Sequence, residues 1–354
     1  MSTITRNDDR KTTDLQAHRL PSWVTPAAFV GAFALGALIT QVFGGFDVLG
    51  ASVVGVLAFL VVLYGVSYAY EGRRWAADRM ATSLVYLAFL LVMLPLVSLL
   101  YKVLVGGIAR FDWQFLSTDM VGIYGEKDGG GALHAIIGTL LVTGIAALIA
   151  IPLGVFTAIY LVEYRGGRIG RAVTFLVDVM TGIPSIVAGL FAFSLFFILV
   201  SPGYKAGIIG AVALAVLMTP VVVRGSEEML KLVPNELREA SYALGVPKWL
   251  TITKVVLRTA IAGITTSVMI AIARVAGETA PLLITIGIVA NVNTNPFEGR
   301  MTTLPVFVFR QYAQGGTANT ERAWAAALAL IIIVMLLNLL ARLVSRYFSP
   351  KGIS

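Results

Sequence analysis

The sequence predicts an all-α polytopic membrane protein with about eight spans. Of its 354 residues, 58% are hydrophobic and only 13% are charged, and the mean hydropathy is +0.86. A soluble protein of this length carries about 25% charged residues, so the composition argues against a soluble enzyme. A membrane-spanning helix needs about 20 apolar residues, and the chain contains eight segments of that kind. These segments lie at 23–43, 48–69, 80–105, 135–162, 173–200, 207–223, 259–290 and 323–345.

The Lys and Arg residues between these segments predict the orientation. With the N-terminus inside, 19 of the 27 basic residues fall on the cytoplasmic side and seven on the outer side, and Arg274 alone lies within a span. Because basic residues favour the cytoplasmic side, both termini are expected there, with an even number of spans. The net charge of +8 is then explained by the orientation in the membrane and not by nucleic-acid binding.

The N-terminal third is expected to form a polar tail, a helical hairpin and one further span. Residues 1–22 lack the charged, apolar and small-residue pattern of a cleaved signal, so the first span should remain in the mature protein. The absence of cysteine excludes disulfides and thiolate metal sites. After the third span, the outer segment 106–134 contains Gly129, Gly130 and Gly131, which are consistent with a hinge or with an ordinary flexible loop.

The loop between the sixth and seventh spans predicts a short helix, a tight turn and a second helix. Pro234 suits a first helical position, Glu236 places an acidic group in the first turn, and Gly245 is a natural stop. After Pro247 a second helix can run back toward the membrane. An amphipathic linker on the membrane surface is the alternative interpretation.

Within this loop, Glu239, Ala240 and Ser241, followed by Gly245, resemble the Glu-Ala-Ala loop of ABC-importer permeases. Two positions depart from that pattern: Ser241 replaces the third motif residue, and Arg258 stands where many members have proline. The runs 272–283, 178–187 and 138–154 resemble the phosphate-specific permeases of the PstA type.

The resemblance implies an ABC importer type I transmembrane domain with an added N-terminal two-helix hairpin. The implied division is a cytoplasmic tail at 1–22, an accessory hairpin at 23–70, a first core span with external loop at 71–132, a permease core at 133–348 that includes the coupling loop 225–258, and a cytoplasmic tail at 349–354. In that family the coupling helix docks on the ATP-hydrolysing subunit, so Glu239, Ala240, Ser241 and Gly245 are the expected ATPase contacts.

The resemblance also implies the partners. They are a PstC-type permease, a PstB-type ATPase dimer and an external phosphate-binding protein, with inorganic phosphate as substrate in a bacterial inner membrane and with no nucleic acid. The chain has no Gly-Lys-Ser or Gly-Lys-Thr phosphate loop, so ATP and magnesium belong to the partner ATPase. We expect no catalytic residue, metal or organic cofactor in this chain.

Phosphate needs cationic compensation inside the membrane, and Arg274 is the cation that lies within a span. Its planar guanidinium can donate two parallel hydrogen bonds to an oxyanion. Glu278 follows at i+4, on the same helical face, where it is expected to pair with Arg274 when no phosphate is present. The alternative is a structural ion pair that only holds two helices together. Arg274, Glu278 and Thr279 are the predicted substrate path.

Proline positions predict interruptions of two spans. Pro281 is expected to break the seventh span just after the Arg274–Glu278 pair, and Pro184 with Ser185 to break the fifth. Asp178, about one turn into the fifth span, is expected to pair with Arg171 or Arg168 or to cap an inner gate.

Three rival functions follow from the same residues. A permease for another oxyanion, such as sulfate or molybdate, would carry the same coupling loop. A carrier driven by an ion gradient would use Asp178 or Glu278 as a proton site. A membrane scaffold without transport activity would tolerate the loss of Arg274.

Overall fold

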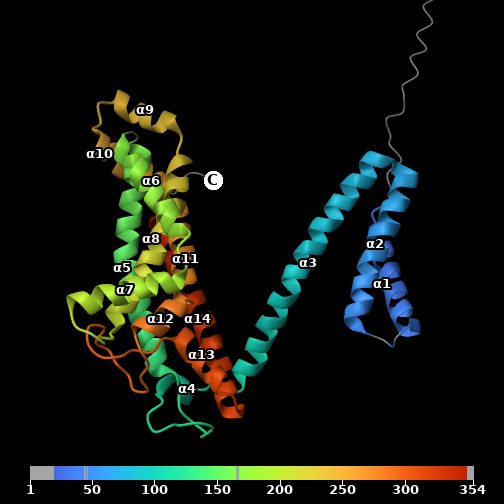
Figure 1. Ribbon diagram of the computed structural model, residues 1–354. Coiled ribbons are helices and arrows are strands. Elements are labelled where there is room, and N and C mark those ends of the chain that lie inside the picture. The colour runs from blue at the N-terminus through green and yellow to red at the C-terminus, as the bar shows by residue number, and fades with distance from the viewer. Residues whose placement is uncertain (1–19, 44, 46, 165–166, 349–354) are drawn as a thin grey trace, which may run out of the picture. The chain divides into compact units, whose positions relative to one another are not determined.

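The computed structural model describes residues 20–43, 45, 47–164 and 167–348, so most of the predicted N-terminal tail and the tail at 349–354 lie outside the described residues. The described chain is helical throughout and contains no β-strand. It forms two compact units, Met1–Leu99 and Leu100–Ser354, with the boundary inside helix α3 (Arg73–Ile108) (Figure 1).

The first unit contains the predicted hairpin, α1 (Val24–Phe43) and α2 (Val48–Glu71), and the first part of α3. Asp47 caps α2 by accepting a hydrogen bond from the Gly50 amide at 2.7 Å. The two hairpin helices approach closely at Gly36, where an added Cβ would lie 2.6 Å from the Ala51 carbonyl oxygen. Small residues at such a crossing let two backbones meet, which is how helices associate in lipid.

Four long helices form the frame of the second unit: α5 (Leu133–Glu163), α8 (Gly207–Lys231), α11 (Leu257–Ala276) and α14 (Thr317–Phe348). Helices α5, α8 and α11 share a core built from side chains such as Val142, Ala146, Met218 and Val275, each no more than 1% exposed, while α14 packs its Ala325, Ala326 and Ala329 in a second cluster. Lipid is as apolar as this core, so close van der Waals packing, not escape from water, holds the helices together.

The predicted fifth span, 173–200, is not one helix. Helix α6 (Arg168–Thr181) ends at Gly182, and α7 (Ser185–Leu199) begins after Pro184 at an angle of 109° to α6. Pro184 has no amide hydrogen and disfavours helical geometry in the residue before it, so the α6 ladder cannot continue. The apolar segment 173–200 is thus interrupted before Pro184, and it contains two helices instead of one.

The predicted seventh span, 259–290, is also divided. Helix α11 stops at Ala276, and a six-residue helix, α12 (Ala280–Thr285), follows with Pro281 in its first turn. Pro281 therefore starts a helix rather than kinking one, because its fixed φ suits a first turn. With the α6–α7 pair counted as one span, the described residues contain up to eight candidate spans, and seven without it.

The end of this unit opposite the loop between α8 and α11 is built from α4 (Trp113–Ser117), α13 (Leu304–Gln314) and their connecting loops. The three glycines before α5 are held in place: the carbonyl of Gly129 accepts a 3.0 Å hydrogen bond from the buried Arg322. A Cβ at Gly131 would lie 2.5 Å from the carbonyl oxygens of Phe115 and Thr118. These glycines thus permit close backbone packing.

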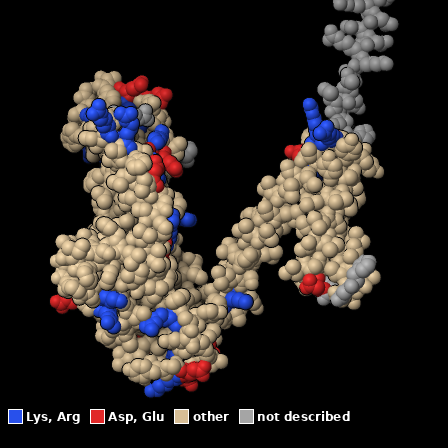
Figure 2. All heavy atoms as spheres, in the orientation of Figure 1, with Lys and Arg blue, Asp and Glu red and all other residues tan. Residues whose placement is uncertain are grey.

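Charged side chains of the second unit gather at its two ends, with a largely uncharged band between them (Figure 2). That distribution is typical of a protein whose middle lies in hydrocarbon.

Candidate functional site

The predicted helix–turn–helix in the loop between α8 and α11 is present. Helix α9 (Asn235–Ala243) is followed by Gly245 with φ of 74°, by α10 (Lys248–Thr251) and by a π-helical turn, Ile252–Val256, that leads into α11. The positive φ of Gly245 reverses the chain where other residues would be strained. The structure narrows the predicted coupling loop, 225–258, because its first residues belong to α8 and its last to the π-helical turn and α11. From here on, the coupling loop is residues 232–251.

Arg238 anchors α9 to the ends of two long helices. Its guanidinium lies 2.8 Å from the Glu163 carboxylate at the end of α5, and the two side chains are only 13% and 4% exposed. It also donates hydrogen bonds to the carbonyls of Leu230, at 3.0 Å, and Val233, at 2.6 Å. One side chain thus satisfies terminal carbonyls of α8 and a buried carboxylate of α5.

A second contact holds the other half of the coupling loop to the same place. The Lys248 ammonium of α10 lies 4.3 Å from the centroid of the Tyr164 ring, and Tyr164 directly follows Glu163. Both helices of the loop, α9 and α10, therefore contact the end of α5. The sequence holds no signal for these roles of Glu163 and Lys248, since their partners are remote in the chain.

Ser241, the residue that departs from the Glu-Ala-Ala pattern, ties α9 to α10. Its hydroxyl lies 2.8 Å from the Thr251 hydroxyl, and Ser241 and Thr251 are 8% and 0% exposed. The Ser241 carbonyl also accepts a hydrogen bond from the Val246 amide at 3.2 Å. The serine thus contributes an internal bond that an alanine cannot make.

Ser241→Ala is expected to loosen the coupling loop locally. Losing one hydrogen bond between buried hydroxyls costs about 1 kcal/mol, so amide hydrogen exchange in α9 and α10 should become roughly fivefold faster. Exchange measured by mass spectrometry on the purified complex tests this, with Ser201→Ala in an exposed loop as the control. Equal exchange in α9 of the two variants would contradict the assignment.

The outward face of the coupling loop carries exposed apolar side chains. Leu244 is 83% exposed, Trp249 62%, Tyr242 41% and Leu237 40%. Glu239 and Ala240 are exposed beside them, whereas Ser241 is buried. Clustered exposed apolar groups on a charged, water-facing end of the molecule are typical of a protein–protein contact.

Arg274 lies in the last turn of α11 with an exposed side chain. Its neighbours Ala271 and Val275 are buried in the core, so Arg274 is on the outward side of the helix. Its guanidinium makes no hydrogen bond or ion pair with any described residue. An unpaired guanidinium inside a span is costly in lipid.

The predicted ion pair between Arg274 and Glu278 is not formed among the described residues. Helix α11 ends at Ala276, and the Glu278 amide bonds the Val275 carbonyl at 3.1 Å, so Glu278 lies beyond the helix end. The i+4 relation holds only along a continuous helix, which explains why the expectation of a shared face was wrong.

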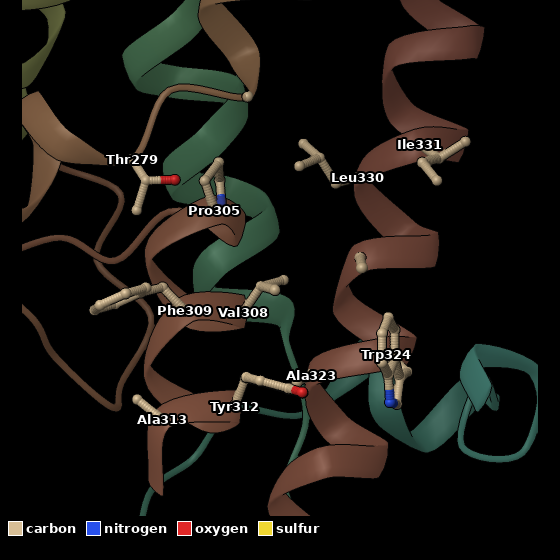
Figure 3. Close-up of a pocket in the computed structure, with 12 residues that line it drawn as sticks. Thr279, Pro305, Val308, Phe309, Tyr312, Ala313, Ala323, Trp324, Leu330 and Ile331 are labelled. Carbon is tan, nitrogen blue, oxygen red and sulfur yellow. The ribbon is translucent and has the colours of Figure 1, made fainter. Parts of the chain in front are cut away.

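Thr279 and Gly277 border a pocket of about 540 Å³ between the helix break and helices α13 and α14 (Figure 3). The remaining lining is mainly apolar and includes Pro305, Phe309 and Trp324. Such walls offer an oxyanion no cation, and Arg274 is not among them. The structure thus places Thr279 at an apolar pocket and Arg274 apart from it.

The two interrupted segments meet through Pro281. A Cβ added at Gly189 of α7 would lie 2.7 Å from the Cα atom of Pro281, and one at Gly210 of α8 would lie 2.9 Å from a Leu282 methyl group. Helix α12 is therefore packed between α7 and α8. Glycines allow this approach, which places α7, the helix that follows the Pro184–Ser185 break, against α12.

Asp178 pairs with Arg224 of α8, and not with the predicted Arg171 or Arg168. Arg224 also lies 2.7 Å from Glu227, which lies 2.7 Å from Lys231. The four charges link α6 to the end of α8. Asp178 and Arg224 are 46 residues apart, so sequence spacing held no signal for this pair.

The comparisons with known proteins agree with this geometry. Residues 150–352 match the family model described as "Binding-protein-dependent transport system inner membrane component". "Phosphate transport system permease protein PstA 1" of Mycobacterium tuberculosis (strain CDC 1551 / Oshkosh) is 46% identical over 276 residues, which cover 77% of this chain and 90% of that protein. "Phosphate transport system permease protein PstA" of Pasteurella multocida (strain Pm70) is 38% identical, with 79% and 97% covered.

Among solved structures, a bacterial ABC transporter that imports the acidic polysaccharide alginate aligns with a TM-score of 0.54 and 16% identity, covering 78% of this chain and 100% of that chain. The MetNI methionine ABC transporter, in an inward-facing conformation, aligns with a TM-score of 0.51 and 19% identity, covering 62% and 96%. These likenesses support the fold alone, and the predicted ABC importer transmembrane fold is confirmed. The chain therefore belongs to the binding-protein-dependent transport system inner membrane components, within the PstA family of phosphate transport permeases.

Proposed function

We propose that this chain is the membrane-spanning permease subunit of an ATP-driven phosphate importer. It forms half of the translocation path and transmits ATPase movement through α9. The observation that carries the proposal is the exposed coupling loop, anchored by Arg238 to Glu163, on a chain 46% identical to a PstA permease. The bias of basic residues supports a bacterial inner membrane location with both termini cytoplasmic.

The partners are a PstC-type permease, a PstB-type ATPase dimer and an external phosphate-binding protein. The exposed Leu244 and Trp249 beside Glu239 and Ala240 suit a groove of the ATPase, with Gly245 setting the turn. The sequence holds no Gly-Lys-Ser or Gly-Lys-Thr loop, so ATP and magnesium bind the ATPase. The chain itself contributes no catalytic group.

Phosphate passes along the face of α11 that carries Arg274, where the second permease completes the path. The support is the exposed, unpaired guanidinium, which is stable within a span only opposite a polar partner or a substrate. Glu278 and Thr279 border the same helix break. Movement at the breaks before Pro184–Ser185 and before Pro281 supplies the gate, since the helices that follow them, α7 and α12, pack together. Asp178 holds the end of α6 to α8 through Arg224.

A permease for sulfate or molybdate would share the coupling loop, and the PstA relatives favour phosphate over both. The test is uptake of labelled phosphate at low external concentration in cells that lack the gene and receive the chain back. Restored uptake, together with capture of the ATPase by the chain, supports the proposal. Capture of the ATPase without restored phosphate uptake would leave the class of transporter but overturn the substrate.

A further inference from the structure

Two pockets follow one another in the wedge between the α1–α2 hairpin and α3, all within the first unit. The head pocket, about 330 Å³, is lined by polar groups that include Thr25, Asp78, Arg79, Thr82, Ser83 and Tyr86. The tail groove, about 600 Å³, is lined by apolar groups that include Phe29, Phe33, Leu60, Leu87, Leu91 and Leu94. One pocket is polar and the next is apolar, so together they match a molecule with a polar head and an apolar tail.

The head pocket has a rigid wall built around a buried ion pair. The Glu71 carboxylate is 1% exposed and receives two hydrogen bonds of 2.7 Å from Arg79. It also accepts from the Ser67 hydroxyl at 2.7 Å and from the Leu20 amide at 2.6 Å. Glu71 and Arg79 neutralise each other, so they shape the pocket without leaving a net charge.

Four further polar groups that line the head pocket make no hydrogen bond or ion pair with any described residue. They are the Asp78 carboxylate and the hydroxyls of Thr82, Ser83 and Tyr86. Helical hydroxyls elsewhere in the chain bond a carbonyl four residues earlier, as Thr139 and Thr285 do at 2.8 and 2.9 Å. The head pocket therefore presents one unpaired negative charge beside three free hydroxyl donors.

The tail groove continues from the head pocket along the same two helices. On α1, Thr25 of the head pocket is followed at helical spacing by Phe29 and Phe33. On α3, the groove lining runs from Leu84 to Leu94, which spans about 15 Å at 1.5 Å per residue. One leaflet contributes about 15 Å of hydrocarbon, so the groove is long enough for an acyl chain.

We propose that this wedge is a binding site for a glycerophospholipid with a primary-amine headgroup, such as phosphatidylethanolamine. The ammonium group pairs with Asp78, and the phosphate oxygens accept hydrogen bonds from the hydroxyls of Thr82, Ser83 and Tyr86. The acyl chains fill the tail groove. A headgroup without an amine would leave its phosphate beside an uncompensated carboxylate, which selects against phosphatidylglycerol.

The test uses the full chain in its purified complex, incorporated in nanodiscs of equal phosphatidylethanolamine and phosphatidylglycerol, then released and analysed by native mass spectrometry. The original chain should retain phosphatidylethanolamine. Asp78→Asn should lower that retention about tenfold, and Asp78→Lys should shift the preference to phosphatidylglycerol. Ala88→Trp fills the tail groove and should remove bound lipid of either kind, whereas Val85→Trp, exposed on α3 outside both pockets, should not.

Equal retention of the two lipids by the original chain would overturn the proposal, as would unchanged retention in Asp78→Asn. A photo-crosslinker at Leu91 that captures another polypeptide instead of lipid would show that a protein helix fills the groove. Asp78→Asn changes only charge, so it decides the matter if Ala88→Trp fails to assemble. None of these readouts depends on phosphate transport.

Discussion

Arg274→Ala is expected to lower phosphate uptake at least tenfold while the chain still assembles with its ATPase. The Arg274 side chain is exposed on a membrane-spanning helix, so its removal breaks no hydrogen bond or ion pair among the described residues. Hydrogen bonds from a charged donor are worth about 1.5–3 kcal/mol, which corresponds to a factor of about 10–150 in binding. Labelled phosphate uptake, with ATPase capture measured in parallel, gives the result.

Two further variants sharpen this test. Arg274→Lys keeps the charge but loses the planar two-bond geometry, so uptake should fall to an intermediate level. Arg258→Ala removes an exposed arginine from the other end of α11 and should leave uptake near that of the original chain. If Arg274→Ala transports phosphate normally, the proposed path along this face of α11 is wrong.

Glu163→Gln is expected to uncouple ATP hydrolysis from transport. The change leaves the guanidinium of Arg238, only 13% exposed, without its carboxylate partner, and breaking a buried pair costs about 3–5 kcal/mol. Helix α9 should then move without carrying the end of α5. In proteoliposomes that contain the complete transporter, phosphate imported per ATP hydrolysed should fall at least fivefold, while the ATPase still binds.

The matched control is Glu236→Gln, because Glu236 is an exposed acid on α9 without a partner among the described residues. That variant should keep the original ratio of phosphate to ATP. Arg238→Lys retains the charge but cannot bond Glu163 and the carbonyls of Leu230 and Val233 together, so it should be partly uncoupled. An unchanged ratio in Glu163→Gln would mean that the coupling loop moves α5 by another contact.

The helix limits of the fifth and seventh predicted spans differ from the structure for one reason. The apolar content persists across Gly182–Pro184 and Gly277–Thr279, so hydropathy alone predicts one segment where the structure has two helices. Hydropathy averages over a window and is insensitive to direction, so a bend of 109° leaves it unchanged. The prolines marked where the interruptions lie, but the angle between the segments depends on what each segment packs against.

Local chemistry in the sequence determined the membrane class, most span limits, the coupling helix with its stop at Gly245, and the family, because composition, periodicity and short motifs act over a few turns. Only the tertiary structure decided which charges meet. Arg238 pairs with Glu163, 75 residues away, and Asp178 pairs with Arg224, 46 residues away. Arg274 and Glu278 are only four residues apart and do not pair. Pairing across helices depends on how the helices pack and where each ends, and that geometry is a property of the whole fold.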